Sequence, residues 1–112
     1  MNLDEDALVG SLLHLPTSDA RTARSLFNRD DLDDPRNQII VNLIDWCLAT
    51  DVRPDPATVF GAARTTGLVP DRNLPDLGVR IIGLHECFPH PTNAAIYAAC
   101  VIVASIRRRM TK

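Results

Sequence analysis

The sequence lacks a long hydrophobic segment. Its longest uninterrupted apolar run extends only from Ala94 to Ala104, far short of the roughly 20 residues that a membrane-spanning helix needs. The N-terminus is acidic rather than basic, so it does not have the pattern of an export signal. These absences predict a cytoplasmic protein with no membrane partner.

An excess of positive charge is also missing. The chain has 12 Lys and Arg residues against 14 Asp and Glu residues, and its formal net charge is -2. Domains that bind nucleic acid usually present a positive field to the phosphates, so we do not expect direct nucleic-acid binding. Without a basic groove, the larger aromatic side chains are expected in the core or along a groove rather than stacked on bases: Trp46, Phe60, Phe88 and Tyr97.

The parts of common catalytic sites are absent as well. A phosphate-binding loop of the form GxxxxGK[ST] needs a lysine inside the loop, and the only lysine is Lys112. The chain has neither a Gly-x-Ser-x-Gly elbow nor an HExxH helix. We therefore predict a protein that is not an enzyme, with no catalytic residue and no cofactor.

Cysteine is scarce, and its spacing predicts neither a disulfide nor a metal site. Cys47, Cys87 and Cys100 form no CxxC pair and have apolar neighbours, so we expect three buried, reduced thiols. The best metal candidate is His85-x-Cys87-x-x-His90, for which a fourth ligand is not assigned. Because Cys87 falls on the apolar face of an expected helix, we favour a structural role for these residues and no metal.

Residues that start and stop helices, by contrast, are abundant. A chain of 112 residues, of which 46% are apolar and 23% charged, is typical of one globular domain, here residues 1–112. Strand alternation is almost absent, and the predicted loops are short. These features predict an all-α fold, a compact bundle of about six helices.

The expected helices have local start and stop signals. Asp34-Pro35 and Asp55-Pro56 each place an acceptor before a proline at the first helical position, and Gly67 sits where a left-handed cap would end the fourth helix. Pro89 and Pro91 enforce an extended break. The expected helices run from Asn2 or Asp4 to Pro16, from Thr17 or Ser18 through Phe27, from Pro35 through Leu48, from Pro56 to Thr66, from Asn73 or Pro75 past Leu84, and from about Thr92 to Arg109.

Apolar residues at helical spacing define the expected core. On the last helix they are frequent enough to predict burial of most of its circumference. Trp46 is expected beside the apolar face of the third helix rather than on it. The core-facing residues expected on the third and fifth helices are Ile39, Ile40, Leu43, Ile44, Cys47 and Leu48, and Leu77, Ile81, Ile82 and Leu84.

Four short motifs follow one another along nearly the whole chain. They are the stretch from Glu5 to Leu13, which reads EDALVGSLL; the residues Leu26, Asp31-Leu32 and Ile39-Ile40; the stretch from Arg53 to Val59; and Pro91-Thr92-Asn93 with Tyr97-Ala98 and Arg107. In order and spacing they resemble the N-terminal domain of DnaB-type replicative helicases. Gly10 would cost about 1 kcal/mol in a helix interior, so we expect it to permit close helix packing.

The resemblance implies a non-catalytic protein-interaction domain in DNA replication. Its implied partners are the replicative helicase ring, primase or a helicase loader, and a weak homo-oligomer is also implied. Family members continue into a helical hairpin and a RecA-like ATPase, whereas this chain stops at Lys112 and has Asn37 where the family has a histidine. Two settings stay open: a fragment of a helicase, or a complete small modulator encoded by a phage or mobile element, which the start at Met1 favours.

Six residues are candidate partner contacts. Cations in a final helical turn are favoured by the helix dipole, so a solvated helix end is the simpler interpretation of the three arginines. The acidic run from Asp30 to Asp34 is most simply a capped, solvated loop, and it equally suits an arginine-rich partner. The candidates are Arg107, Arg108, Arg109, Asp30, Asp31 and Trp46.

A function of another class is the alternative. The chain would then be a small helical DNA-binding or transcription-regulating protein. Such a protein needs several basic side chains on one exposed helix face. Only the end of the last helix at Arg107 and the pair Arg21 and Arg24 offer anything similar.

Overall fold

The first helix, α1 (Leu3–Leu12), starts where its local sequence predicts. The side chain of Asn2 accepts a hydrogen bond from the backbone N–H of Glu5 at 3.2 Å, which confirms Asn2 as the N-cap. Acidic residues occupy the first turn, where the helix dipole favours negative charge. The helix ends at Leu12, before Pro16, because the next residues form a tighter turn.

The remaining elements confirm the all-α prediction. In this computed structural model, residues 2–88 and 90–111 are described, so the expectations for Met1, Pro89 and Lys112 lie outside the described residues. Between Asn2 and Thr111, leaving out position 89, the secondary structure is helical and contains no strand. The elements after α1 are α2 (Thr17–Arg24), η1 (Arg29–Asp31), α3 (Pro35–Ala49), α4 (Pro56–Thr66), η2 (Asp71–Asn73), α5 (Leu74–Cys87), η3 (Pro91–Asn93) and α6 (Ala94–Met110).

Both Asp-Pro signals are confirmed. The carboxylate of Asp34 accepts from the N–H of Arg36 at 2.9 Å, and that of Asp55 accepts from the N–H of Thr58 at 2.9 Å. Gly67 has a φ of 70° and ends α4 in the left-handed conformation. Short-range chemistry is therefore sufficient to set the limits of α4 and the start of α3.

The second helix differs from its prediction at both ends. Pro16 occupies the N-cap position and makes no side-chain cap, so the expected capping by Thr17 or Ser18 is wrong. The helix ends at Arg24 rather than near Phe27. Arg24 reaches forward and donates to the carbonyl oxygen of Phe27 at 2.7 Å, which holds the chain in a turn that buries the Phe27 ring.

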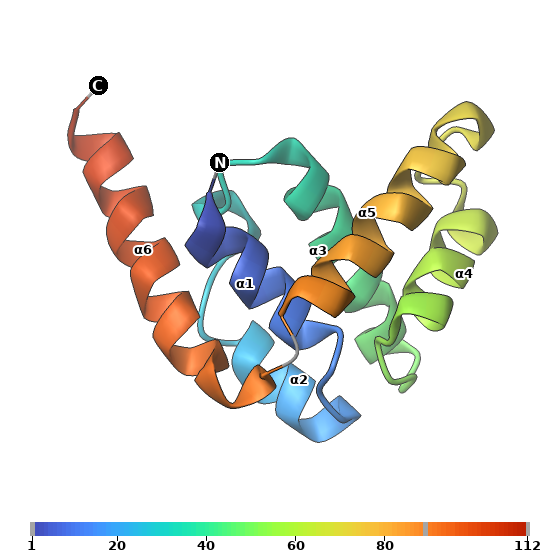
Figure 1. Ribbon diagram of the computed structural model, residues 1–112, viewed down its shortest axis with the longest axis horizontal. Coiled ribbons are helices and arrows are strands. Elements are labelled where there is room, and N and C mark those ends of the chain that lie inside the picture. The colour runs from blue at the N-terminus through green and yellow to red at the C-terminus, as the bar shows by residue number, and fades with distance from the viewer. Residues whose placement is uncertain (1, 89, 112) are drawn as a thin grey trace.

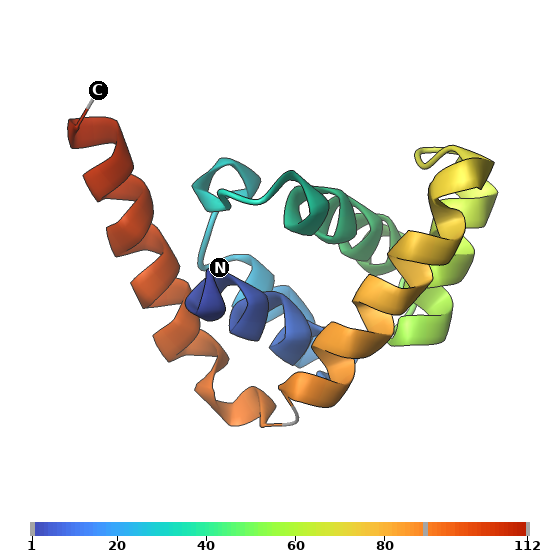
Figure 2. The same cartoon turned by 45° about the horizontal axis from the view of Figure 1, so that its top comes forward.

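The helices are arranged around α1. Figures 1 and 2 show α1 in the middle, α6 along one side of it, and α5 with α4 on the other. Gly10 lies where α1 meets α5: a β-carbon there would be 2.6 Å from the carbonyl oxygen of Leu84. The prediction that Gly10 permits close packing is confirmed. The largest fully buried apolar side chains are Leu8, Leu12, Leu13, Leu32, Ile40, Leu43, Ile44 and Ile81.

The predicted apolar faces were too wide on three helices. Ile39 on α3 and Ile82 on α5 are exposed, because each lies on the edge of a stripe whose centre packs inward. On α6 the fully buried residues are few, and all of them are small except one: Ala94, Ala98, Val101 and Ser105. The prediction that most of the α6 circumference is buried is therefore wrong.

Two of the three thiols are also exposed. Cys47 is buried, as predicted, but Cys87 and Cys100 are exposed, so the prediction of three buried thiols is wrong. Each of the latter lies on the outer side of a helix that packs inward through other residues.

Among the described residues, no single helix is long and apolar enough to span a membrane. The segments Asp71–Cys87 and Pro91–Met110 reach that length and composition only as a pair bent by 90°.

Candidate partner-binding surface

The arginine-bearing end of α6 is tied to η1 through Asp31. One carboxylate oxygen of Asp31, Oδ1, accepts from Ser105 Oγ at 2.9 Å and from Arg109 Nη2 at 3.3 Å. Its other oxygen accepts from the backbone N–H of Asn28 at 2.9 Å, which closes a capping box around η1. The Asp31 carbonyl oxygen accepts from Arg108 Nη2 at 3.0 Å. A single buried residue thus positions two of the three arginines.

These contacts change the interpretation of the candidate residues. Asp31 is buried, so the prediction of a solvated acidic loop is wrong for this residue, whereas Asp30 is exposed. Arg108 is half-buried and lies 3.6 Å from the Asp33 carboxylate, so it is not a free solvated cation either. Arg107 is exposed, and among the described residues no ion pair involves it. Asp31 is buried because folding places Ser105, which lies 74 positions later in the sequence, over it.

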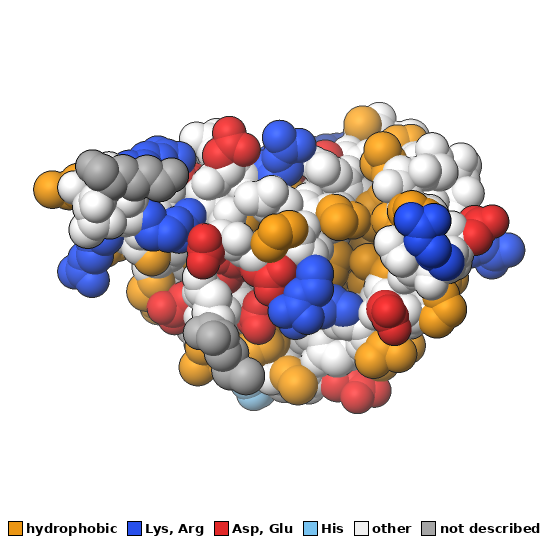
Figure 3. All heavy atoms as spheres, turned by 90° about the horizontal axis from the view of Figure 1, so that it is seen from above, with side chains coloured by type: hydrophobic (Ala, Val, Ile, Leu, Met, Phe, Trp, Pro, Cys, Tyr) orange, Lys and Arg blue, Asp and Glu red, His pale blue; other side chains and the backbone are white. Residues whose placement is uncertain are grey.

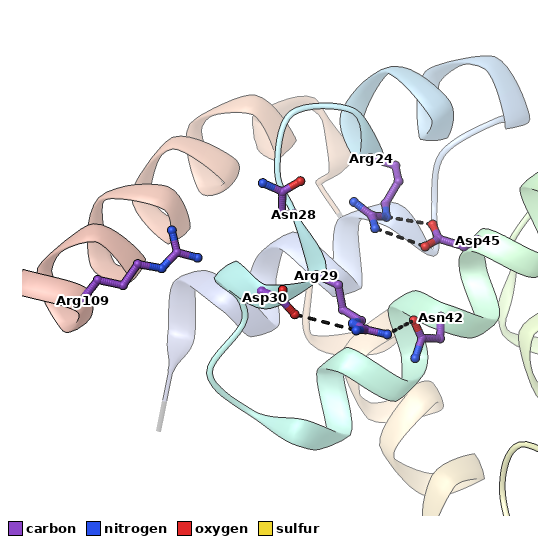
Figure 4. A pocket seen from close by; sticks show the side chains of 7 residues that line it. All are labelled: Arg24, Asn28, Arg29, Asp30, Asn42, Asp45 and Arg109. Atoms are coloured by element: carbon purple, nitrogen blue, oxygen red, sulfur yellow. Dashed lines mark hydrogen bonds and ion pairs between the residues drawn. The ribbon is translucent and has the colours of Figure 1, made fainter. Parts of the chain in front are cut away.

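An open polar cavity of about 320 Å³ lies beside this cluster. Figure 4 shows Arg109 extending from α6 toward it, opposite Arg24 and Arg29. Its arginines already have partners: Arg24 makes a two-pronged contact with Asp45 at 2.7 and 3.1 Å. The complete lining is Arg24, Asn28, Arg29, Asp30, Asn42, Asp45 and Arg109.

The cavity has little free positive charge to offer an anion. Arg29 donates to Asn42 Oδ1 at 3.1 Å and lies 3.7 Å from Asp30. A phosphate entering here would have to displace carboxylates from the guanidinium groups, which costs the contacts they already make. The surface seen in Figure 3 has the same mixed character, with cationic side chains near the end of α6 and carboxylates close by.

The structure brings four of the six candidate residues together, but not Arg107 or Trp46. Asp30 and Arg109 line one cavity, and Asp31 contacts two arginines. Trp46 lies on α3, is 37% exposed, and is not part of the cavity lining. The placement of Trp46 beside the apolar face of α3 rather than on it agrees with this exposure.

The arginine pair of the alternative function is also engaged. Arg21 donates to the carbonyl oxygen of Leu48 at 2.7 Å and to Asp51 at 3.0 Å. Arg24 is held by Asp45 as described above. Both guanidinium groups therefore link α2 to α3 and the residues after it, and the side chain of Arg21 stays 48% exposed.

A buried polar cluster under this region was missed from the sequence. Glu5 is fully buried, and its carboxylate accepts from the N–H groups of Asp33 and Asp34 at 2.7 and 2.9 Å and from Asn37 at 3.0 Å. Arg80 of α5 donates to Asn37 Oδ1 at 2.8 Å. The cluster joins α1, α3 and α5. In the sequence, Asn37 lies between the polar residues Arg36 and Gln38 in the first turn of α3, so nothing there signalled its burial.

One carboxylate at the edge of this cluster has a perturbed pKa. The hydrogen bonds and charge of Arg36 hold the pKa of Asp34 below its usual value, although partial burial acts in the opposite direction. Arg36 reaches Asp34 Oδ2 at 2.7 Å through its Nη2 group. The negative charge on Asp34 is thereby maintained at the N-cap of α3, where the helix dipole also favours it.

Two of the histidines, His14 and His85, pack against each other. The ring of His85 stacks on that of His14 at a centroid distance of 3.8 Å, and His14 Nε2 donates to the His85 carbonyl oxygen at 2.6 Å. Burial, followed by the charge of His14, lowers the pKa of His85. Across residues 2–88 and 90–111, no group of three or more His, Cys, Asp or Glu side chains is placed to hold a metal ion. Cys87 is exposed, not part of an apolar face.

Comparisons with known proteins identify the fold. No family model matches the sequence, and no curated protein matches it. Among solved structures, the chain is similar to the N-terminal domain of DnaB helicase from Mycobacterium tuberculosis, with a TM-score of 0.83 and 22% sequence identity. The superposition covers 96% of this chain and 75% of that one. The fold of this chain is thus the fold of a DnaB helicase N-terminal domain.

Proposed function

We propose that this chain is a non-catalytic protein-interaction domain that acts in DNA replication, in the cytoplasm. Its partners are the replicative helicase ring, primase or a helicase loader, and it self-associates weakly. The observation that carries the proposal is the likeness of nearly the whole chain, 96% at a TM-score of 0.83, to the N-terminal domain of a DnaB helicase.

The polar surface supports contact with protein rather than with nucleotide. The exposed arginines alternate with carboxylates, and the cavity beside α6 is lined by both. Such surfaces suit complementary protein partners, because charges of both signs fix the register of a complex. The proposed contact residues are Arg107, Arg108, Arg109, Asp30 and Trp46, while Asp31 acts by positioning two of these arginines.

The proposal applies in two settings. In one, the chain is part of a longer helicase and contacts neighbouring subunits. In the other, it is a separate protein of phage or mobile-element origin that binds the helicase of its host. Both settings require the chain to bind a replication protein, so one experiment tests them together.

Native mass spectrometry of the chain mixed with the replicative helicase, primase or loader of its own organism tests the proposal. A complex of defined stoichiometry with at least one of these proteins is the expected result. The triple variant Arg107→Ala, Arg108→Ala, Arg109→Ala should weaken that complex, and the matched control is Arg64→Ala, which removes an exposed arginine from the last turn of α4. No complex with any of the three proteins would refute the proposed function.

A titration of nonspecific duplex DNA separates this function from the DNA-binding alternative. Phosphate-driven binding weakens steeply as salt rises. We expect no binding at about 50 mM salt, because the guanidinium groups of Arg21 and Arg24 already have protein partners. Tight, strongly salt-dependent binding would favour the DNA-binding protein instead.

A further inference from the structure

The outward side of α6 carries an uninterrupted apolar stripe. Its members alternate in spacing by three and four residues, and all are exposed: Ile96, Ala99, Val103, Ile106 and Met110. The buried stripe of the same helix lies on the opposite side, at positions 94, 98, 101 and 105. α6 is therefore apolar on two opposite faces, of which only one packs against the rest of the chain.

This exposure is large for a solvated helix face. Ile96 is 62% exposed, Val103 46% and Met110 78%. The face of a surface helix that points away from the core normally carries charged or polar residues. In Figures 1 and 2, no other element lies on the outer side of α6. A contiguous apolar surface of this kind marks an interaction site more often than a solvated face.

The spacing of the stripe defines the shape of its occupant. Steps of three and four residues are the a and d positions of a heptad, the pattern by which one long helix packs along another. α6 has 17 residues and is therefore about 25 Å long. A single helix of similar length fits this seam.

Charge distinguishes between a second copy of the chain and a different partner. α6 contains no acidic residue, although acidic residues outnumber basic ones in the whole chain. Arg107 lies beside the apolar stripe, is exposed, and makes no ion pair among the described residues. A second α6 would bring another arginine and no carboxylate to this edge, whereas an acidic helix would supply the missing partner.

We propose that the outward face of α6 binds an amphipathic α-helix of another protein, one that is apolar at its a and d positions and acidic beside them. The apolar residues of that helix pack between Ile96 and Met110, and its carboxylates lie next to Arg107. This inference deepens the proposed function by naming the surface and the chemistry of the partner, and it rests on that function.

The test uses synthetic helical peptides, so that its outcome does not depend on identifying the natural partner. One peptide of three heptads has Leu at a and d and Glu at e and g. The second has Lys in place of Glu, and the third is a scrambled version of the first. Binding to the intact chain is measured by fluorescence anisotropy. We expect the acidic peptide to bind at least about tenfold more tightly than either of the others.

Variants of the chain locate the binding site. Val103→Asp places a charge in the middle of the stripe and should weaken acidic-peptide binding by about tenfold or more. Its control is Val79→Asp, which changes an exposed valine on α5. Arg107→Glu should reverse the preference between the acidic and the lysine peptide, while Arg64→Glu on α4 should leave it unchanged. Far-UV circular dichroism confirms that each variant remains folded.

Four results would overturn the inference. The first is equal binding of all three peptides, and the second is acidic-peptide binding that Val103→Asp leaves unchanged. The third is a dimer in sedimentation velocity that Val103→Asp dissociates, which would make a second copy the occupant. The fourth is cosedimentation with anionic vesicles without peptide binding, which would assign the stripe to a lipid surface. If no peptide binds but the complex with a replication protein forms, only this inference is refuted. If the acidic peptide binds but no replication protein does, only the proposed function is refuted.

Discussion

Ser105 Oγ donates a buried hydrogen bond of 2.9 Å to Asp31 Oδ1, and this contact joins α6 to η1 across 74 residues. The hydroxyl of Ser105 lies on the inward stripe of α6, so its partner had to be buried with it. The same carboxylate accepts from Arg109, so the bond also fixes the end of the helix that carries the arginines. Asp31 therefore both holds α6 in place and positions the arginine-bearing end of that helix.

Removing the charge of Asp31 should destabilise the protein. In Asp31→Asn, an amide N–H₂ replaces one acceptor and faces an existing donor, so we expect the free energy of unfolding to fall by about 2 kcal/mol. Ser105→Ala removes only one bond and should cost about 1 kcal/mol. Urea unfolding followed by circular dichroism measures both. Asp30→Asn is the control, since it changes an exposed carboxylate and should stay within about 0.5 kcal/mol of the parent. Equal effects of Asp31→Asn and Asp30→Asn would contradict the role of Asp31.

Gly10→Ala should destabilise the chain although alanine favours helix. The added β-carbon would meet the Leu84 carbonyl oxygen at 2.6 Å, and overpacking of this kind costs about 1 to 3 kcal/mol. The matched control is Gly83→Ala on α5, where no atom lies within 4 Å of the new methyl group. That substitution should stabilise by about 0.5 to 1 kcal/mol through helix propensity. Thermal and urea unfolding of the two variants should shift in opposite directions, and a shift of both toward higher stability would disprove the close contact.

The three thiols should differ in reactivity. Burial raises the pKa of the Cys47 thiol, which reduces the fraction of reactive thiolate, and its Sγ lies 3.7 Å from the Thr58 carbonyl oxygen. Cys87 and Cys100 are exposed. Iodoacetamide at pH 8, followed by peptide mass spectrometry, should label Cys87 and Cys100 in the folded protein and Cys47 only in urea. Labelling of Cys47 at the same rate as the other two would show that its site opens readily.

Because of His85, the free energy of unfolding should decrease as the pH falls below the ordinary histidine range. Burial lowers the pKa of His85 in the folded state from its ordinary value of 6.5, so the unfolded chain takes up the proton first. The stability contributed by neutral His85 is therefore fully present above about pH 6.5 and is lost as the pH falls toward the folded-state pKa. We expect the free energy of unfolding to drop more between pH 7.5 and pH 5.5 in the parent than in His85→Gln.

Two further observations make the His85 measurement specific. Asp34, whose pKa Arg36 lowers from 3.8, affects stability only at lower pH and does not overlap this range. An NMR titration of the His85 ring protons reports the folded-state value directly. A midpoint at or above 6.5, or identical pH slopes for the two proteins, would rule out His85 as the source.

Local signals explain what was predicted correctly. An aspartate before a proline caps a helix through atoms only two or three residues away, as Asp34 and Asp55 do. Gly67 ends α4 for an equally local reason, since glycine adopts the left-handed conformation at no steric cost. The order of these signals along the chain was enough to predict an all-α fold, while the likeness to a DnaB N-terminal domain was predicted from the resemblance of four sequence motifs.

Burial of polar groups could not be predicted in the same way. Asp31 belongs to an acidic run that the sequence alone assigns to solvent, and Glu5 to the acidic first turn of α1, yet both are buried and accept several hydrogen bonds. Among the donors, Asp33 is 28 positions away from Glu5 and Ser105 is 74 positions away from Asp31. Nothing in the local sequence distinguishes these two carboxylates from exposed neighbours such as Asp30.

The sequence by itself determined where α3 and α4 start and where α4 stops, because capping and backbone restriction act within one turn. Tertiary structure decided which side of each helix is covered. On α6, periodicity marks both faces as apolar, and only the packing of Ala94, Ala98, Val101 and Ser105 against the rest of the chain leaves Ile96, Val103 and Met110 facing outward. The physical reason is that small residues permit close approach to α1, so the face with the smaller side chains is the one that packs inward.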